Sequence, residues 1–176
     1  MPFFYFKIKY ASEKPAVPSV QFMKNTIVVI ASEFKGNEFL EEAQNAGWHV
    51  ILVTKKKLLD SPWVWTSIDE VKTVEDDAGV MDYIRTVTNI AGSRVLDRVV
   101  GLDEFDVLTA AMTREHLNLP GLSRSHALRF RDKLTMRNIA FNAGIPCPEF
   151  VGAFNAERID QFLAEVPAPW VVKPRH

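Results

Sequence analysis

The chain has 176 residues, of which 47% are apolar and 24% are charged, and its formal net charge is −1. This composition is typical of a soluble globular protein, and the balanced charge gives no reason to expect a nucleic-acid partner. No apolar stretch approaches about 20 residues, so no membrane span is expected, and the single Cys147 indicates a reducing compartment such as the cytoplasm.

Residues 1–25 do not share the pattern of the remaining chain. Pro15 and Pro18 would interrupt any regular element, so we expect an irregular N-terminal extension. Met23-Lys24-Asn25 directly precedes the first predicted strand, so Met23 is a candidate start residue as well as Met1.

From residue 26 onwards, strand-like apolar runs alternate with helical patterns. The β-branched run at 26–31 is typical of a buried parallel strand, and a helix at 38–46 follows and ends at Gly47. Further strands are predicted at 48–53, 71–74 and 98–101, helices at 80–90 and 105–116, and a Trp-containing loop at 61–67. This alternation predicts an α/β fold with a parallel sheet.

The last third of the chain is predicted to be mostly helical. Ser123 is a candidate cap for a short helix, and a stronger helix at 131–143 ends at Gly144. Asn155 is expected to cap a helix at 156–166 whose apolar face is buried. Short strands are predicted at 149–153 and 170–173.

Two lysines of this region are candidate anion ligands. Lys173 ends a predicted apolar strand, where a cation must reach water or meet an anion because burying it alone is costly. Lys133 lies in the first turn of a predicted helix, where open backbone N–H groups attract anions. Both lysines could instead be solvated, as we expect for the basic run at 55–57, and Asp132 could simply complement the helix dipole.

The loop after the first strand argues against one familiar function. A dinucleotide-binding domain would carry Gly-x-Gly-x-x-Gly there, because its backbone must approach the pyrophosphate closely. Only Gly36 is present, so nicotinamide or flavin binding is not expected.

Several short motifs follow one another between residues 101 and 174. They are Gly101-Leu102-Asp103-Glu104-Phe105, Leu119-Pro120-Gly121, Arg131-Asp132-Lys133, Ala143-Gly144-Ile145-Pro146-x-Pro148 and Val171-Val172-Lys173-Pro174. In this order and spacing the set resembles the start of the ATP-grasp domain of ligases that activate a carboxylate with ATP. Residues 26–122 are similar to the Rossmann-like domain that precedes it. The resemblance therefore implies a pre-ATP-grasp domain at 26–122 and the truncated start of an ATP-grasp domain at 123–176.

The resemblance also implies roles for individual residues. In the family, the lysines of the Asp-Lys and Val-Lys-Pro motifs contact ATP phosphates, and these roles fall on Lys133 and Lys173. The family's acidic turn lies near the substrate, which makes Asp103 and Glu104 candidate substrate-proximal residues. The same two residues could instead cap the helix at 105–116.

Complete family members use ATP and Mg²⁺ to make an acyl phosphate, from which an amine or similar acceptor displaces phosphate. The resemblance thus implies the N-terminal part of a carboxylate ligase with small-molecule substrates, and it allows a homodimer. The family's magnesium ligands follow the Val-Lys-Pro motif, so we expect no metal site within this chain and no activity from it alone. The alternative function is a non-catalytic Rossmann-like module for binding or dimerisation.

Overall fold

The computed structural model of the chain describes residues 24–175. All but the last two residues of the predicted irregular extension therefore lie outside the described range, as do both candidate start residues, Met1 and Met23. His176 also lies outside it.

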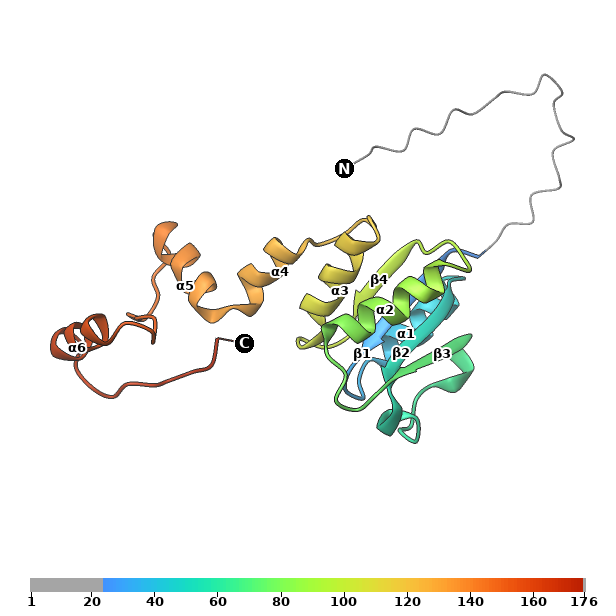
Figure 1. Cartoon of the computed structure of the whole chain (residues 1–176), viewed down its shortest axis with the longest axis horizontal. Coiled ribbons are helices and arrows are strands. Elements are labelled where there is room, and N and C mark those ends of the chain that lie inside the picture. Colours follow the sequence, from blue (N-terminus) through green and yellow to red (C-terminus); the bar gives the residue numbers. More distant parts are fainter. Residues whose placement is uncertain (1–23, 176) are drawn as a thin grey trace, which may run out of the picture.

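A parallel sheet forms the centre of the structure (Figure 1). Its four strands within the described residues are β1 (Thr26–Ala31), β2 (His49–Lys55), β3 (Glu70–Val74) and β4 (Arg98–Gly101). They lie in the order β3-β2-β1-β4, and every neighbouring pair is parallel. The predicted α/β fold with a parallel sheet is therefore confirmed.

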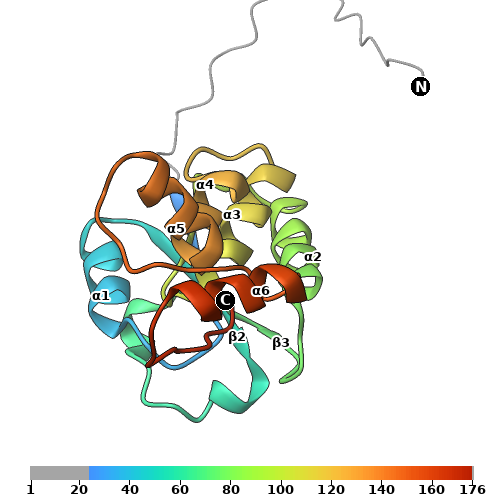
Figure 2. The same cartoon turned by 90° about the vertical axis from the view of Figure 1, so that its left-hand side faces the viewer.

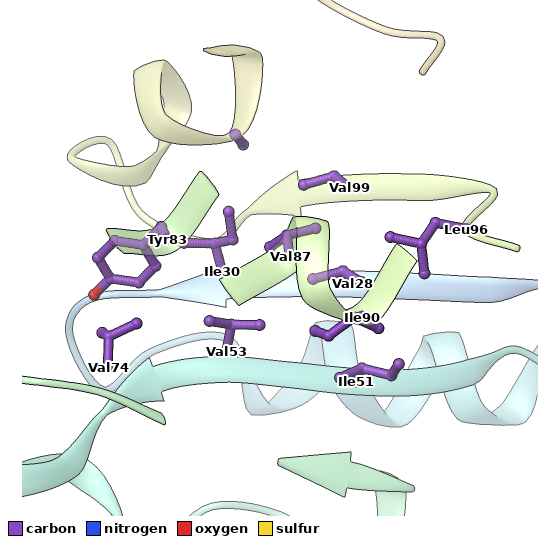
Figure 3. Packing of buried hydrophobic residues seen from close by; sticks show 11 residues of the cluster. Val28, Ile30, Ile51, Val53, Val74, Tyr83, Val87, Ile90, Leu96 and Val99 are labelled. Carbon is purple, nitrogen blue, oxygen red and sulfur yellow. The ribbon is translucent and has the colours of Figure 1, made fainter. Parts of the chain in front are cut away.

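Helices cover both faces of the sheet. The helix α1 (Asn37–Asn45) packs on one face, where Leu40 joins Ile27 and Val29 of β1 in a buried cluster. The helices α2 (Val80–Ala91) and α3 (Asp106–His116) cover the other face, where Val28 meets Val87 (Figure 3). Because successive side chains of a strand point to opposite faces, the continuous β-branched run of β1 supplies both clusters.

The remaining helices extend away from the sheet (Figure 1). They are α4 (Arg124–Arg131), α5 (Lys133–Asn142) and α6 (Ala156–Glu165). Both predicted caps are confirmed: the His126 amide donates to Ser123 Oγ at 3.3 Å, and the Arg158 amide donates to Asn155 Oδ1 at 2.9 Å. Of these three helices, α4 packs on α3, and α5 in turn packs on α4. After α6 the chain returns, and its described end lies close to α4 and α5 (Figures 1 and 2).

Three predictions for this region are wrong. The segments 149–153 and 170–173 are irregular rather than strands, and Val172 is 92% exposed. A strand is held by hydrogen bonds to a neighbour, and no strand among residues 24–175 lies beside either segment. The face of α6 expected to be buried is also uncovered, since no residue of α6 is buried and Leu163 is 41% exposed.

The predicted helix at 131–143 is interrupted near its start. Asp132 has an extended backbone, with φ −83° and ψ 107°, and it separates α4 from α5. The helical pattern of the sequence continues across this point, but the aspartate side chain competes for the backbone amides and begins a new helix.

Candidate functional site

Asp132 organises the junction between α4 and α5. Its side chain is buried, and its Oδ1 accepts hydrogen bonds from the Leu134 amide at 3.0 Å and the Thr135 amide at 3.2 Å. Aspartate is a favoured N-cap because its oxygens satisfy amides that have no partner within the helix. Lys133 is therefore the first residue of α5, whereas the sequence predicted a helix from residue 131 with Lys133 in its first turn.

Arg175 joins the end of the described chain to this junction. Its Nε donates to Asp132 Oδ1 at 3.0 Å, its Nη2 bonds Oδ2 of the same carboxylate, and its carbonyl accepts from the Lys133 amide at 2.9 Å. The guanidinium of Arg175 is the main cause that lowers the pKa of Asp132 to about 2. These contacts hold the segment of Lys173 against the first turn of α5, so that the two predicted lysines come from adjacent segments.

One argument made from the sequence is wrong. The first amides of α5 are not open to an anion, because the Lys133 amide bonds the Arg175 carbonyl and the next three amides bond Asp132. Any attraction for an anion must therefore come from the ammonium groups. Lys133 is half-buried and Lys173 is exposed, so neither charge is shut away from solvent.

The acidic turn follows β4 and begins α3. Asp103 Oδ1 accepts from the Phe105 amide at 3.1 Å, and Oδ2 meets Lys35 Nζ at 3.0 Å. These two partners, the amide first, lower the pKa of Asp103. Asp103 thus closes the turn before α3 and does not cap the helix, whose N-cap is Phe105 without a side-chain hydrogen bond, and it also faces the loop between β1 and α1.

Glu104 connects this turn to the α4–α5 junction. Its carboxylate pairs with Arg131, whose guanidinium is buried and lies 5.3 Å from the centre of the Phe105 ring. Arg131 directly precedes Asp132, which binds Arg175. Three ion pairs, Lys35–Asp103, Glu104–Arg131 and Asp132–Arg175, therefore lie between the loop after β1 and the α4–α5 junction. Asp103 and Glu104 belong to these pairs, and Lys133 and Lys173 lie close to them in the sequence.

The sheet order reverses between β1 and β4, so the topological switch point of the sheet lies at the carboxyl ends of these two strands. In open α/β sheets ligands bind at this position. The buried carboxylate of Asp106 accepts from the Ser32 amide at 3.1 and 3.2 Å, and burial raises its pKa. A Cβ on Gly101 would lie 2.7 Å from the Asp106 carbonyl oxygen, so a glycine is needed where β4 approaches α3. Asp106 thus joins the loop after β1 to the start of α3 at this switch point.

Sequence reasoning missed four residues of this arrangement. They are Lys35, Asp106, Arg131 and Arg175. Arg131 belonged to the Arg131-Asp132-Lys133 motif, and Asp106 and Arg175 directly followed other motifs, but nothing in the sequence showed which charges pair. Among residues 24–175 no group of three His, Cys, Asp or Glu side chains is arranged to hold a metal ion. No helix in the same range is long and apolar enough to cross a bilayer.

Comparison with known proteins identifies the class of this fold. Residues 40–121 match the ATP-grasp N-terminal domain. The L-amino acid ligase from Bacillus licheniformis superimposes with a TM-score of 0.67 at 20% identity, over 84% of this chain and 36% of that one. The N5-carboxyaminoimidazole synthetase from Staphylococcus aureus, complexed with ADP, superimposes with a TM-score of 0.65 at 19% identity, over 87% of this chain and 40% of that one. Phosphoribosylglycinamide synthetase from Anaerococcus prevotii superimposes with a TM-score of 0.64 at 15% identity, over 84% of this chain and 36% of that one.

Residues 40–121 thus match the ATP-grasp N-terminal domain, and the chain shares the fold of the N-terminal part of ATP-grasp ligases. The resemblance inferred from the sequence motifs is therefore confirmed. This chain spans just over a third of the length of the L-amino acid ligase. No curated protein sequence is significantly similar to it. The division into domains at residue 122 stays a prediction.

Proposed function

We propose that this chain is the N-terminal part of an ATP-dependent carboxylate ligase that works through an acyl phosphate, with an amine or similar group as acceptor. Its substrates are small molecules, and it acts in the cytoplasm. Lys133 and Lys173 contact the phosphates of ATP, while Asp103 and Glu104 lie near the substrate beside the carboxyl ends of β1 and β4.

The observation that carries this proposal is the contact between Arg175 and Asp132. It places the Val-Lys-Pro segment beside the first residue of α5, so two ammonium groups lie on adjacent segments. Ammonium groups act as mobile point charges toward phosphate, and two of them suit a polyphosphate better than one. The ADP complex of the synthetase from Staphylococcus aureus supports a nucleotide as the ligand.

Magnesium would accompany ATP, because metal ions neutralise the charge that develops during phosphoryl transfer. The described residues do not fit a magnesium site, since no suitable group of ligands occurs among them. We therefore propose that the metal is held outside residues 24–175 and that the chain alone does not turn over. A screen of ADP release with pooled carboxylates and amines tests this, and turnover above about 1 s⁻¹ would contradict it.

The binding role is tested by NMR on the ¹⁵N-labelled chain, titrated with ATP and separately with inorganic tripolyphosphate. We expect saturable shifts at the amides of Lys133 and Lys173 with both ligands. Substitution of either lysine by alanine should remove them, because a charge-assisted contact contributes about 1.5–3 kcal/mol. The matched control is Lys57→Ala, in the exposed basic loop.

Two results would count against the phosphate assignment. The first is that the shifts persist in the Lys133 and Lys173 variants. The second is an intact fold with no response to either ligand, which would favour the alternative function as a non-catalytic binding or dimerisation module.

A further inference from the structure

Arg114 of α3 is a buried cation whose charge no acidic side chain neutralises. Its side chain is 9% exposed, and none of the ion pairs among residues 24–175 includes it. Its Nη1 donates to the Val99 carbonyl at 2.7 Å, and its Nε and Nη2 donate to the Leu122 carbonyl at 3.3 and 2.8 Å. Carbonyl groups carry only partial charges, so the full charge of the guanidinium remains uncompensated, which is costly in a protein interior.

Two cavities that are open to solvent lie beside the edge strand β4. The larger has a volume of about 380 Å³, and the smaller about 210 Å³. Arg114 lines both, and Arg98 also lines the larger; the other residues around them are Val99, Val100, Gly101, Val107, Ala110, Pro120, Gly121 and Leu122. The walls thus combine positive charge with an apolar surface and contain no acidic residue.

The neighbouring loop is shaped around Arg114. Gly121 has φ +136°, a conformation that side chains rarely allow. A Cβ at this position would lie 2.8 Å from Arg114 Cδ and 2.9 Å from Nε, so only a glycine lets the loop close over the arginine. The three hydrogen bonds to carbonyls fix the guanidinium and leave two of its five N–H groups for another acceptor. The cation is therefore held in place before any ligand arrives.

We propose that the cavity beside β4 binds a small carboxylate with an apolar body. The planar fork of an arginine matches a carboxylate, and Arg98 adds a second positive charge at the larger cavity. The apolar walls suit a hydrocarbon body, and the carboxylate supplies the missing countercharge. This site is distinct from Lys133 and Lys173, and it rests on Arg114, Arg98 and the apolar walls, so it does not depend on the proposed ligase function.

The test uses isobutyrate as the probe and isobutyramide as its uncharged isostere, at constant ionic strength in chloride. The side-chain Nε–H signal of Arg114 is followed by ¹⁵N NMR in the full chain. Isobutyrate should give a saturable shift of this signal and of the Val100 amide, whereas isobutyramide should give none. Equal shifts with the two compounds, or a response that does not saturate, would overturn the proposal.

Two variants locate the binding without removing Arg114, which also holds the loop. Leu122→Trp narrows the cavity and keeps the backbone carbonyl that Arg114 uses, and it should weaken isobutyrate binding at least tenfold. Its matched control is Leu59→Trp, at another partly exposed leucine, which should bind as the wild type does. Arg98→Gln, at an exposed position, should weaken binding several-fold. Wild-type affinity in both cavity variants would show that isobutyrate binds elsewhere and would overturn the assignment.

Discussion

Replacement of Asp132 by alanine should loosen the start of α5 and release the segment of Lys173. The buried carboxylate accepts two backbone amides and binds Arg175 through both oxygens. Loss of an aspartate cap costs about 1 kcal/mol, which is about a fivefold change in the opening equilibrium. The lost tether to Arg175 adds to this. We therefore expect at least about fivefold faster hydrogen exchange at the Leu134 and Thr135 amides.

Two further variants separate the cap from the tether. Asp132→Asn keeps a favoured capping residue and loses the charge, so the first-turn amides should stay protected while the Arg175 contact weakens. Arg175→Ala removes the tether and keeps the cap. Asn155→Ala is the matched control, because it uncaps α6 and should leave α5 unchanged. Wild-type exchange at Leu134 and Thr135 in the Asp132→Ala protein would refute this account of the junction.

Three other predictions concern single groups. The pKa of Asp132 is depressed from an ordinary 3.8 to about 2, so its contribution to stability should be complete above about pH 4 and should be lost as the pH falls through 2. In Arg175→Ala this loss should begin at a higher pH, nearer the ordinary pKa of an aspartate. An NMR titration of the first-turn amides of α5 would show the difference. The buried hydroxyl of Tyr83 has no hydrogen-bond partner among the described residues, so Tyr83→Phe should raise the free energy of unfolding by about 1 kcal/mol in urea. Thr113→Val removes a hydroxyl that has a hydrogen-bond partner, so it should lower the free energy of unfolding. An equal effect of Tyr83→Phe and Thr113→Val would contradict this prediction. Gly101→Ala should lower the free energy of unfolding by about 1–3 kcal/mol, because the added Cβ would meet a backbone oxygen of α3. An unchanged urea midpoint would show that β4 can move aside.

Local sequence signals predicted the elements whose causes are local. The β-branched run of β1 and the caps at Ser123 and Asn155 depend on residues within a few positions, and all three are confirmed. The segment 170–173 has an equally strong strand pattern, yet it is irregular because a strand also needs a partner that no local pattern reveals. The same limit explains the uncovered face of α6.

The buried face of α3 shows a second limit. Hydrophobic periodicity favours apolar residues as the inward face, yet Asp106, Thr113 and Arg114 are all buried in this helix. The Thr113 hydroxyl donates to the Thr109 carbonyl within the helix, whereas Asp106 and Arg114 have partners elsewhere in the chain, the Ser32 amide and the Val99 carbonyl. Polar burial of this kind depends on contacts between distant parts of the chain.

The sequence motifs nominated two lysines for the candidate site but could not predict the ion pairs around them. The motifs pointed to Lys133 and Lys173, but the contact that brings their segments together joins Asp132 to Arg175, 43 positions away. The pair of Lys35 with Asp103 spans 68 positions. Many opposite charges could pair at such separations, and only the fold selects among them.

The central claim is that Lys133 and Lys173 recognise the phosphates of ATP, and the preference for ATP over AMP measures this most directly. Affinities of the chain for both nucleotides would be determined with the wild type and with Lys133→Ala, Lys173→Ala, Lys173→Arg and the control Lys57→Ala. The account predicts that either alanine substitution lowers the ATP preference by roughly 10- to 150-fold. Lys173→Arg should restore it only in part, because a planar guanidinium does not reproduce an ammonium point charge. Equal preference for ATP in the control and in both alanine variants would contradict the claim.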